Sequence, residues 1–357
     1  MLKFIRTLLA SQPRPVVEIR PQGVEITLDH GQTILEAALA QGIAYPHNCT
    51  VGTCGACRTR LREGEVRAIT DFGYTLSKQE LAAGYILACQ AVPCQPRLCV
   101  EIPSPGADLP EPASYQATVA ATELLTHDVM KVTVRPDRPV PYVAGQYASF
   151  RAPGLQRARH YSFADAPQRG GREQLTFFIR KVPGGQFTDL LFGGQLTGRP
   201  LSMEAPHGEF HLRAGNAPMI CIVGGSGLAP LLGVLEDARK NRIRRRCILL
   251  FGARTECDLY MLDAIRDIAQ GWLEPFSFVP VLSNEAADGA WTGARGLVTE
   301  HIEAACKGLD PSACEAYMCG PPPMIDAAIE RLTGLGTPIE AIFYDKFTDG
   351  RDDALAA

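Results

Sequence analysis

Four cysteines constrain the fold of this chain more than any other sequence feature. Cys49, Cys54 and Cys57 follow the spacing C-x4-C-x2-C, and Cys89 comes later, in Leu87-Ala-Cys-Gln90. This spacing is typical of the four thiolate ligands of a [2Fe–2S] cluster. We therefore expect the N-terminal part of the chain to fold around such a cluster.

Two alternatives bear on this site. A structural zinc ion is commonly bound by pairs of C-x2-C ligands, whereas this segment has one such pair and two single cysteines. Cys94 and Cys99 are rival fourth ligands, but Cys89 stands at the expected distance. Gly52 and Gly55 favour the cluster, because they allow a tight loop whose backbone amides face the sulfur atoms.

Length and composition describe an ordinary globular chain. Its 357 residues suit two or three domains, and 46% hydrophobic with 21% charged residues excludes a disordered or fibrous chain. A net charge of −4 argues against a nucleic-acid partner. We find no apolar run of about 18 residues that could span a bilayer and no secretory signal. We expect a cytoplasmic protein, in which the twelve cysteines do not form a disulfide framework.

The changing pattern along the chain predicts three domains. Residues 1–15 are an N-terminal extension, and 16–103 hold the cysteines. The proline-rich segment 104–114 is a linker. Residues 115–214 contain short alternating stretches separated by Gly and Pro, which indicate an antiparallel barrel. In residues 215–357 apolar strands alternate with helices, which indicates a parallel doubly wound sheet.

The strands and helices expected in each block follow from these patterns. In the first block we expect strands at Val16–Arg20 and Val24–Leu28 and a helix at Ile34–Gln41. In the second we expect strands at Thr118–Ala120, Met130–Val134, Tyr147–Arg151 and Leu175–Lys181. In the third we expect strands at Met219–Val223, Cys247–Phe251, Phe276–Leu282, Glu315–Cys319 and Ala341–Tyr344, and helices at Pro230–Lys240 and Pro323–Thr333.

The barrel block carries residues suited to a flavin. In Arg159-His-Tyr161-Ser162, the Arg can pair with a pyrophosphate, the Tyr can lie against an isoalloxazine ring, and the Ser can bond the flavin N5 edge. The turn at Gly184 and Gly185, with Thr188, offers amides and a hydroxyl to phosphate. Taken alone, Tyr161 would equally suit a core position in the barrel.

The third block carries a glycine loop and a cysteine. Gly225-Ser-Gly227-Leu-Ala-Pro230 reads G-x-G-x-x-P, which differs from the usual dinucleotide fingerprint at its last position. Proline is acceptable in a first helical turn, so the loop can still present amides to a pyrophosphate. Cys319, in Cys319-Gly-Pro-Pro, ends a later strand, where ligands bind on such sheets. Taken alone, each feature could also be structural.

Together these residues resemble the ferredoxin–NAD(P)H reductase superfamily. More narrowly, the chain is similar to the reductase components of bacterial multicomponent aromatic oxygenases, and among them to the electron-transfer components of xylene monooxygenases. The resemblance implies a β-grasp ferredoxin domain of the plant type, an FAD barrel and an NADH domain. Other matching stretches are Pro46-His-Asn-Cys49, Leu191-Phe-Gly-Gly194, Phe251-Gly-Ala-Arg254, Asp258-Leu-Tyr260 and Pro322-Pro-Met-Ile-Asp326.

The resemblance also implies roles for the site residues. Cys319 would sit at the nicotinamide, and a C-terminal aromatic residue would cover the flavin until the nicotinamide displaces it. Phe347 matches that place best, and Tyr344 is an alternative. Residues implied to bind FAD are Arg159, Tyr161, Ser162, Gly184, Gly185 and Thr188, with Ser162 near N5; those implied to bind the nucleotide are Gly225, Gly227 and Pro230.

The implied activity is electron transfer from NADH through FAD and the cluster to a terminal oxygenase or hydroxylase. A nicotinamide gives two electrons at once and a [2Fe–2S] cluster takes one, so a flavin must stand between them. The alternatives are a reductase serving a cytochrome P450 or a separate ferredoxin, and an electron-carrier module without turnover. Arg254 and Thr255 could bind the 2′-phosphate of NADPH, whereas Glu256 and Asp258 would repel it. The resemblance implies NADH, because relatives with Gly-Ala-Arg at this place use NADH.

The first twelve residues form an amphipathic pattern, in which apolar side chains recur at helical spacing beside Lys3 and Arg6. A helix this short is marginal in water. It would order only on a surface, either a membrane interface or a partner. The alternative is a frayed terminus or a short helix packed on its own ferredoxin domain. Because xylene monooxygenase hydroxylases are embedded in the membrane, this segment predicts peripheral association at the inner face of the membrane.

Overall fold

The computed structural model describes residues 13–47, 49–102, 109–155, 157–286 and 289–348. They form two compact units: the N-terminal sheet is in one unit, and the other two main sheets are in the second. The helix expected within residues 1–12 lies outside the described residues. In the described part of the chain, no helix is long and apolar enough to cross a bilayer.

The first unit is a β-grasp fold built on a five-stranded sheet in the order β2-β1-β7-β3-β5. The central pair β1 and β7 is parallel, and the other pairs are antiparallel. Its sheet strands are β1 (Val16–Arg20), β2 (Val24–Thr27), β3 (Arg58–Glu63), β5 (Tyr85–Leu87) and β7 (Arg97–Glu101); β4 (Val66–Ala68) and β6 (Ala91–Pro93) form a separate antiparallel pair, and the helices are α2 (Ile34–Ala40), α3 (Lys78–Ala82) and the 3-10 turns η2 (Phe72–Tyr74) and η3 (Ala88–Gln90).

Both helices of this unit begin with a capping box. The Thr33 side chain accepts the amide of Glu36, whose carboxylate accepts the amide of Thr33 in return, and Ser77 and Glu80 repeat the arrangement. Each pair satisfies backbone donors that a helix start leaves unbonded. The loop between α2 and β3 carries three of the four cysteines.

The second unit begins with a six-stranded antiparallel barrel in the order β11-β10-β13-β8-β9-β12. An isolated bridge between Phe163 and Phe177 joins the two edges of this sheet. The core is filled by residues such as Phe150 and Leu201. The elements are β8 (Ala113–Leu124), β9 (Val129–Pro136), β10 (Tyr147–Arg151), β11 (Arg159–Ser162), β12 (Leu175–Arg180), α4 (Gln186–Phe192) and β13 (Pro200–His207).

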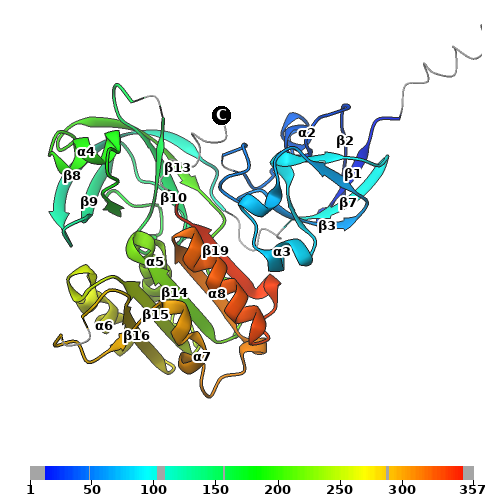
Figure 1. Ribbon diagram of the computed structural model, residues 1–357. Helices are drawn as coiled ribbons and strands as arrows, with labels where there is room; N and C mark the ends of the chain where they lie inside the picture. Colours follow the sequence, from blue (N-terminus) through cyan, green and yellow to red (C-terminus); the bar gives the residue numbers. More distant parts are fainter. Residues whose placement is uncertain (1–12, 48, 103–108, 156, 287–288, 349–357) are drawn as a thin grey trace, which may run out of the picture. The chain divides into compact units, whose positions relative to one another are not determined.

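The rest of the second unit is a doubly wound sheet of parallel strands in the order β17-β16-β15-β14-β18-β19. Helices lie on both of its faces (Figure 1). The strands are β14 (Met219–Gly224), β15 (Cys247–Ala253), β16 (Phe276–Leu282), β17 (Ala294–Arg295), β18 (Glu315–Gly320) and β19 (Ile342–Lys346); the helices are α5 (Leu228–Lys240), α6 (Leu262–Gln270), α7 (Ile302–Ala305) and α8 (Pro322–Gly334).

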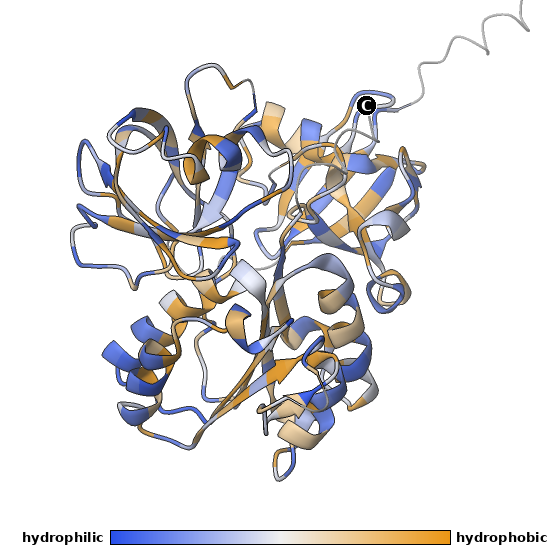
Figure 2. Ribbon diagram, turned by 60° about the vertical axis from the view of Figure 1, so that its left-hand side comes forward, coloured by the Kyte–Doolittle hydropathy of each residue, from blue (hydrophilic) through white to orange (hydrophobic). Residues whose placement is uncertain are grey.

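The two faces of this sheet bury separate cores. One core combines α5 and α6 with barrel residues, among them Val129 and Phe178. The other lies under α7 and α8, where Ile302 and Ile329 are fully buried. Figure 2 shows the apolar strands of the sheet and the polar outer faces of the helices. Because the barrel contributes to the first core, the barrel and the nucleotide-type sheet pack as one unit.

Candidate functional site

The four N-terminal cysteines lie in two pairs. The Sγ atoms of Cys57 and Cys89 are 3.2 Å apart. Cys49 and Cys54 exchange contacts, because the Sγ of Cys49 accepts the amide of Cys54 at 3.3 Å and the Sγ of Cys54 accepts the amide of Cys49 at 3.4 Å. Three cysteines come from the loop between α2 and β3, and Cys89 comes from η3. The fold thus brings together the four residues that the spacing predicts.

Glycine is required where this loop meets the fourth cysteine. Gly52 has a φ of +87°, and a Cβ there would lie 2.8 Å from the Cγ of Gln90. The Gln90 amide donates to the carbonyl oxygens of Thr50 at 3.4 Å and of Cys89 at 3.0 Å. Gly55 has a φ of +73°. The two glycines let the loop close over the Cys89 segment.

The sulfur geometry fits a [2Fe–2S] cluster better than one zinc ion. No three of these sulfurs form a mutually close group within 4.8 Å among the residues described, whereas tetrahedral zinc ligands would lie about 3.8 Å apart. A hydrogen bond from the Cys54 thiol and then bonds from backbone amides lower the pKa of Cys49 to about 4. Of the rival ligands, Cys94 is exposed after β6, and Cys99 lies in β7 opposite Glu18.

The motif Arg159–Ser162 forms β11 of the barrel and pairs with β10. The Ser162 side chain is buried and Arg159 is half-buried. The Tyr161 ring lies 5.5 Å from that of Phe187 and 6.1 Å from that of Phe150, and burial raises the pKa of its phenol. One side of Tyr161 therefore packs on the barrel core, as one interpretation of the sequence predicted.

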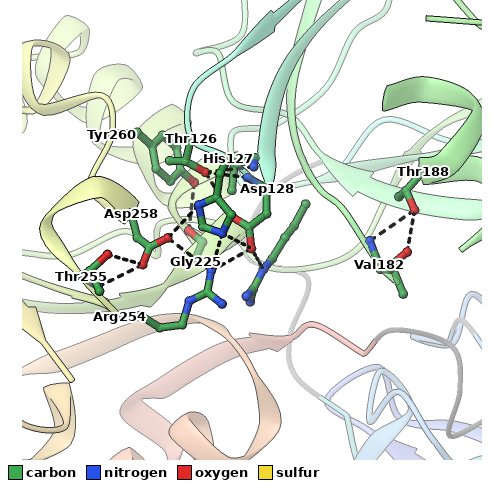
Figure 3. A network of polar contacts seen from close by, with 12 residues as sticks. Thr126, His127, Asp128, Val182, Thr188, Gly225, Arg254, Thr255, Asp258 and Tyr260 are labelled. Atoms are coloured by element: carbon green, nitrogen blue, oxygen red, sulfur yellow. Dashed lines mark hydrogen bonds and ion pairs between the residues drawn. The ribbon is translucent and has the colours of Figure 1, made fainter. Parts of the chain in front are cut away.

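The turn before α4 is held by Thr188. Its hydroxyl accepts the amide of Val182 at 3.2 Å and lies 3.2 Å from the carbonyl oxygen of the same residue (Figure 3). It also lies 3.0 Å from the carbonyl oxygen of Gly185. Gly185 is the N-cap of α4, and a Cβ there would lie 2.7 Å from the Thr188 hydroxyl. Gly184, with a φ of +73°, has open space around it. Thr188 thus shapes the turn, and the backbone amides of the turn are the groups that can face a phosphate.

The glycine loop and Cys319 meet at one point of the parallel sheet. The loop follows β14, and Cys319 lies near the end of the neighbouring strand β18. A Cβ on Gly227 would lie 2.1 Å from the carbonyl oxygen of Cys319, so only glycine fits. Chain order reverses between β14 and β18, and ligands of such sheets bind at this switch point. Pro230 lies in the first turn of α5, as predicted.

A pocket of about 220 Å³ opens beside this loop. Its walls come from the glycine loop, the end of β15, the start of α8 and the barrel, and they include Gly225, Arg254 and Met324. The barrel contributes Asp128 and Arg180. This location, at the carboxyl ends of parallel strands and beside glycine amides, suits a dinucleotide.

Cys319 and the residues at the end of the neighbouring strand β19 lie at the same edge. Cys319 is fully buried, and burial raises the pKa of its thiol. The Phe347 amide, directly after β19, donates to the carbonyl oxygen of Gly320 at 2.8 Å. Tyr344, the alternative to Phe347, packs against the core under α8, on the face of the sheet opposite Cys319. Asp345 was missed by sequence reasoning; it pairs with Cys319 in register, and burial raises its pKa to about 7.

Sequence profiles of three domain families match the chain in order. They are the 2Fe-2S iron-sulfur cluster binding domain at residues 17–94, the oxidoreductase FAD-binding domain at 116–212 and the oxidoreductase NAD-binding domain at 219–330. The chain is also 40% identical over 345 residues to the xylene/toluene monooxygenase electron transfer component XylA of Pseudomonas putida, with 97% of each chain covered.

The chain belongs to the family of oxygenase reductase components. Another member, the phenol 2-monooxygenase reductase component DmpP of Pseudomonas sp. strain CF600, is 33% identical, with 95% of this chain and 96% of the relative covered. Among solved structures, the Amycolatopsis cytochrome P450 reductase GcoB aligns with a TM-score of 0.68 and 32% identity, over 94% of this chain and 99% of that one.

Membership of this family confirms the predicted fold and cofactors. The chain is an oxidoreductase with a [2Fe–2S] domain, an FAD domain and an NAD domain, in the order that the sequence patterns predicted. The predicted resemblance to the xylene monooxygenase components is also confirmed. The roles of individual site residues stay predictions.

Proposed function

We propose that this chain is the NADH-dependent reductase that supplies single electrons to a terminal oxygenase. The observation that carries the proposal is that one chain provides both a nucleotide pocket, where electrons would enter, and cluster ligands, from which they would leave. A loop and the 3-10 turn η3 together form two cysteine pairs, and a pocket suited to a dinucleotide is lined by Gly224 and Gly225 of the glycine loop. When bound, NADH supplies two electrons together, FAD accepts them and releases them one at a time, and the cluster carries single electrons.

The residues at each site have distinct roles in this proposal. Cys49 and Cys54 would hold one iron and Cys57 and Cys89 the other, because the sulfurs lie in these pairs. The FAD would be held by Arg159, Tyr161 and Ser162 of β11 and by the turn of Gly184, Gly185 and Thr188.

At the nucleotide site, Gly225, Gly227 and the first turn of α5 with Pro230 would receive the pyrophosphate. Cys319 would pack against the nicotinamide. Phe347 fits the role of the displaceable aromatic residue better than Tyr344, because it stands at the end of β19 beside Gly320 while Tyr344 packs in the core under α8.

A turnover assay separates this proposal from an electron-carrier module without activity. The purified holoprotein should reduce cytochrome c with NADH as the sole electron donor. The same protein after chelation of its iron should keep NADH-dependent dye reduction through the flavin. A protein that contains cluster and FAD but reduces neither acceptor would refute the proposal.

The partner is proposed from the relatives' names. The relatives are described as components of xylene/toluene and phenol monooxygenases and as a P450 reductase. We propose an aromatic or alkyl-aromatic oxygenase as the terminal partner, with a cytochrome P450 or a separate ferredoxin as the second candidate. Coupled turnover with each purified class of partner decides between them, because only the true acceptor should yield hydroxylated product at a rate matching NADH consumption.

The proposed location is the cytoplasm, at the inner face of the membrane if the partner is a membrane hydroxylase. Deleting residues 1–12 should then lower coupled turnover with membranes that contain this partner and leave cytochrome c reduction unchanged. Equal coupled rates would refute the membrane role of the segment. We also propose the domain division stated from the sequence, with 16–103 for the cluster, 115–214 for FAD and 215–357 for NAD; limited proteolysis within 104–114 would test it.

A further inference from the structure

Arg254 lies at the position where doubly wound dinucleotide-binding domains contact the adenine ribose of the coenzyme. It follows β15 directly, and β15 is both the second strand of this domain and the neighbour of β14. At this place an acidic residue bonds the 2′-hydroxyl of NAD, or an arginine receives the 2′-phosphate of NADP. Arg254 also lines the pocket. Arg254 alone would therefore predict a preference for NADPH, which conflicts with the proposed use of NADH.

The structure resolves this conflict, because two carboxylates hold the Arg254 guanidinium. Its Nη2 lies 2.9 Å from Oδ2 of Asp128 and 3.2 Å from Oδ1 of Asp258 (Figure 3). The same Asp128 oxygen accepts from the Nε of Arg180 at 3.0 Å. Asp258 comes from the nucleotide-type domain, whereas Asp128 comes from the barrel, directly before β9. Arg254 is thus held from two domains at once.

Both carboxylates are fixed in place. The Asp258 Oδ2 accepts the amide and the hydroxyl of Thr255, each at 3.0 Å. Asp128 accepts from the Thr126 hydroxyl at 3.1 Å. The side chains of Asp128 and Asp258 are only 17% and 12% exposed, against 48% for Arg254. Burial alone would raise the pKa of Asp128, but the bond from Arg180 and the nearby charges outweigh burial and hold that pKa below its usual value.

The charges in this network cancel. Two carboxylates face two guanidinium groups, so no net positive charge is left for a phosphate. His127 completes the group, with its Nε2 3.3 Å from the Nη2 of Arg254. The ligand atoms of His127, Asp128 and Asp258 are close enough to hold a metal ion. The Arg254 guanidinium already contacts all three, so the cation at this place is Arg254 itself.

We infer that Asp128 and Asp258 select NADH over NADPH by neutralising Arg254, so that the barrel takes part in choosing the coenzyme. This inference rests on the proposed function and deepens it. Sequence reasoning pointed to Glu256 and Asp258 as groups that repel a 2′-phosphate. The structure adds Asp128, which no pattern near the glycine loop identifies. It also gives Asp258 a different role, because Asp258 occupies an arginine that would otherwise bind the phosphate.

The test compares kcat/KM for NADPH and NADH in dye reduction by the FAD-loaded holoprotein. Asp128→Asn should raise the NADPH/NADH ratio by about tenfold or more, the factor that one charge-assisted hydrogen bond to a phosphate provides. Asp258→Asn should raise it in the same direction. Adding Arg254→Ala to Asp128→Asn should return the ratio to the wild-type value, because the gain depends on a released Arg254.

Asp137→Asn is the matched control. Asp137 directly follows β9, at the end opposite Asp128, and pairs with Arg138 at 3.4 Å. The substitution therefore removes the same charge next to the same strand, but away from the pocket. Its ratio should equal that of the wild type. The inference is overturned if neither Asp128→Asn nor Asp258→Asn raises the ratio, if the rise survives without Arg254, or if Asp137→Asn raises it equally.

The wild-type protein distinguishes a failure of the inference from a failure of the proposed function. Wild-type protein that reduces dye with neither coenzyme would refute the proposed function. Wild-type protein that prefers NADPH would overturn the inference and the choice of NADH, but would leave the proposed reductase activity intact. If Asp128→Asn failed to retain FAD, Asp258→Asn would decide in its place. Its NADPH/NADH ratio of kcat/KM would be measured with and without Arg254→Ala.

Discussion

Asp345 lies opposite Cys319 in the register between β18 and β19, at the edge that also holds Gly320. Burial raises its pKa from 3.8 to about 7. The Asp345 carboxyl and the Cys319 thiol are thus both uncharged in slightly acidic solution, which keeps this side of the proposed nicotinamide site apolar. No sequence pattern singled out Asp345, because an acidic residue near the end of a strand usually faces solvent.

This burial predicts how the stability of the second unit depends on pH. Between about pH 4 and 7 the folded carboxyl keeps its proton while the unfolded one has lost it, so the free energy of unfolding should fall as the pH rises through this window. Asp345→Asn should flatten the dependence. Thermal midpoints measured from pH 4 to 8 check this, and an equally steep decline in the variant would contradict it.

Arg159 is the charged residue of the proposed FAD site. Arg159→Ala should weaken FAD binding by about 1.5–3 kcal/mol, the scale of a charge-assisted hydrogen bond. FAD content after extensive dialysis measures the loss. Arg151→Ala on the neighbouring strand β10 is the control, because Arg151 is exposed and lies outside the motif. An unchanged FAD content in Arg159→Ala would remove this residue from the site.

Cys319 should affect the chemical step more than nucleotide binding. Because the Cys319 side chain is fully buried at the switch point, its loss should misplace the nicotinamide and leave the pyrophosphate loop intact. In Cys319→Ala, flavin bleaching by NADH should slow by about tenfold to a hundredfold. Stopped-flow absorbance measures the rate, and NADH affinity is measured separately. A normal rate would make Cys319 a packing residue only.

At the scale of elements, the loop after β14 and the end of β18 depend on each other's backbone. Gly227→Ala would bring a Cβ to 2.1 Å from the Cys319 carbonyl oxygen. It should lower the free energy of unfolding by about 1–3 kcal/mol, the usual cost of overpacking, and weaken NADH binding. Gly334→Ala, at the end of α8 with open space around it, is the control and should lower neither the stability nor the NADH affinity. Calorimetry that shows equal midpoints for both variants would contradict the predicted contact.

Sequence patterns predicted most of these elements. The predicted strands Val16–Arg20, Tyr147–Arg151 and Phe276–Leu282 have the observed bounds. Helix α5 begins at Leu228, before the predicted Pro230, because proline is tolerated anywhere in a first helical turn. Helix α6 was not predicted, because the segment is short and its N-cap residue, Met261, gives no capping signal.

The site was predictable only where its residues are close in the sequence. The cysteine spacing, the glycine loop and the Arg159 motif are local patterns with direct chemical reasons. The link from Asp128 to Arg254 joins residues far apart in the sequence and in different domains, so it required the fold. The preference for Phe347 over Tyr344 likewise gained support only from the fold, in which Tyr344 packs against the core under α8 and Phe347 comes directly after β19.

At the scale of the whole molecule, the proposed function has one chain carry electrons from NADH to its own [2Fe–2S] cluster. The barrel and the nucleotide-type domain share a core that contains Val129, Phe178 and Met219, so they should act as one reducing unit. The cluster domain is a separate compact unit. Removing the cluster should therefore leave the reducing unit active.

The most direct test is an EPR measurement after anaerobic addition of NADH to wild-type and Cys54→Ser holoprotein, with dye reduction measured on the same samples. The wild type should develop the signal of a reduced [2Fe–2S] cluster. Cys54→Ser should lose that signal and keep NADH-dependent dye reduction, because Cys54 belongs to a cysteine pair and the flavin lies in the other unit. A variant that keeps the signal, or wild-type protein that reduces dye with NADH while its cluster stays oxidised, would contradict this electron path.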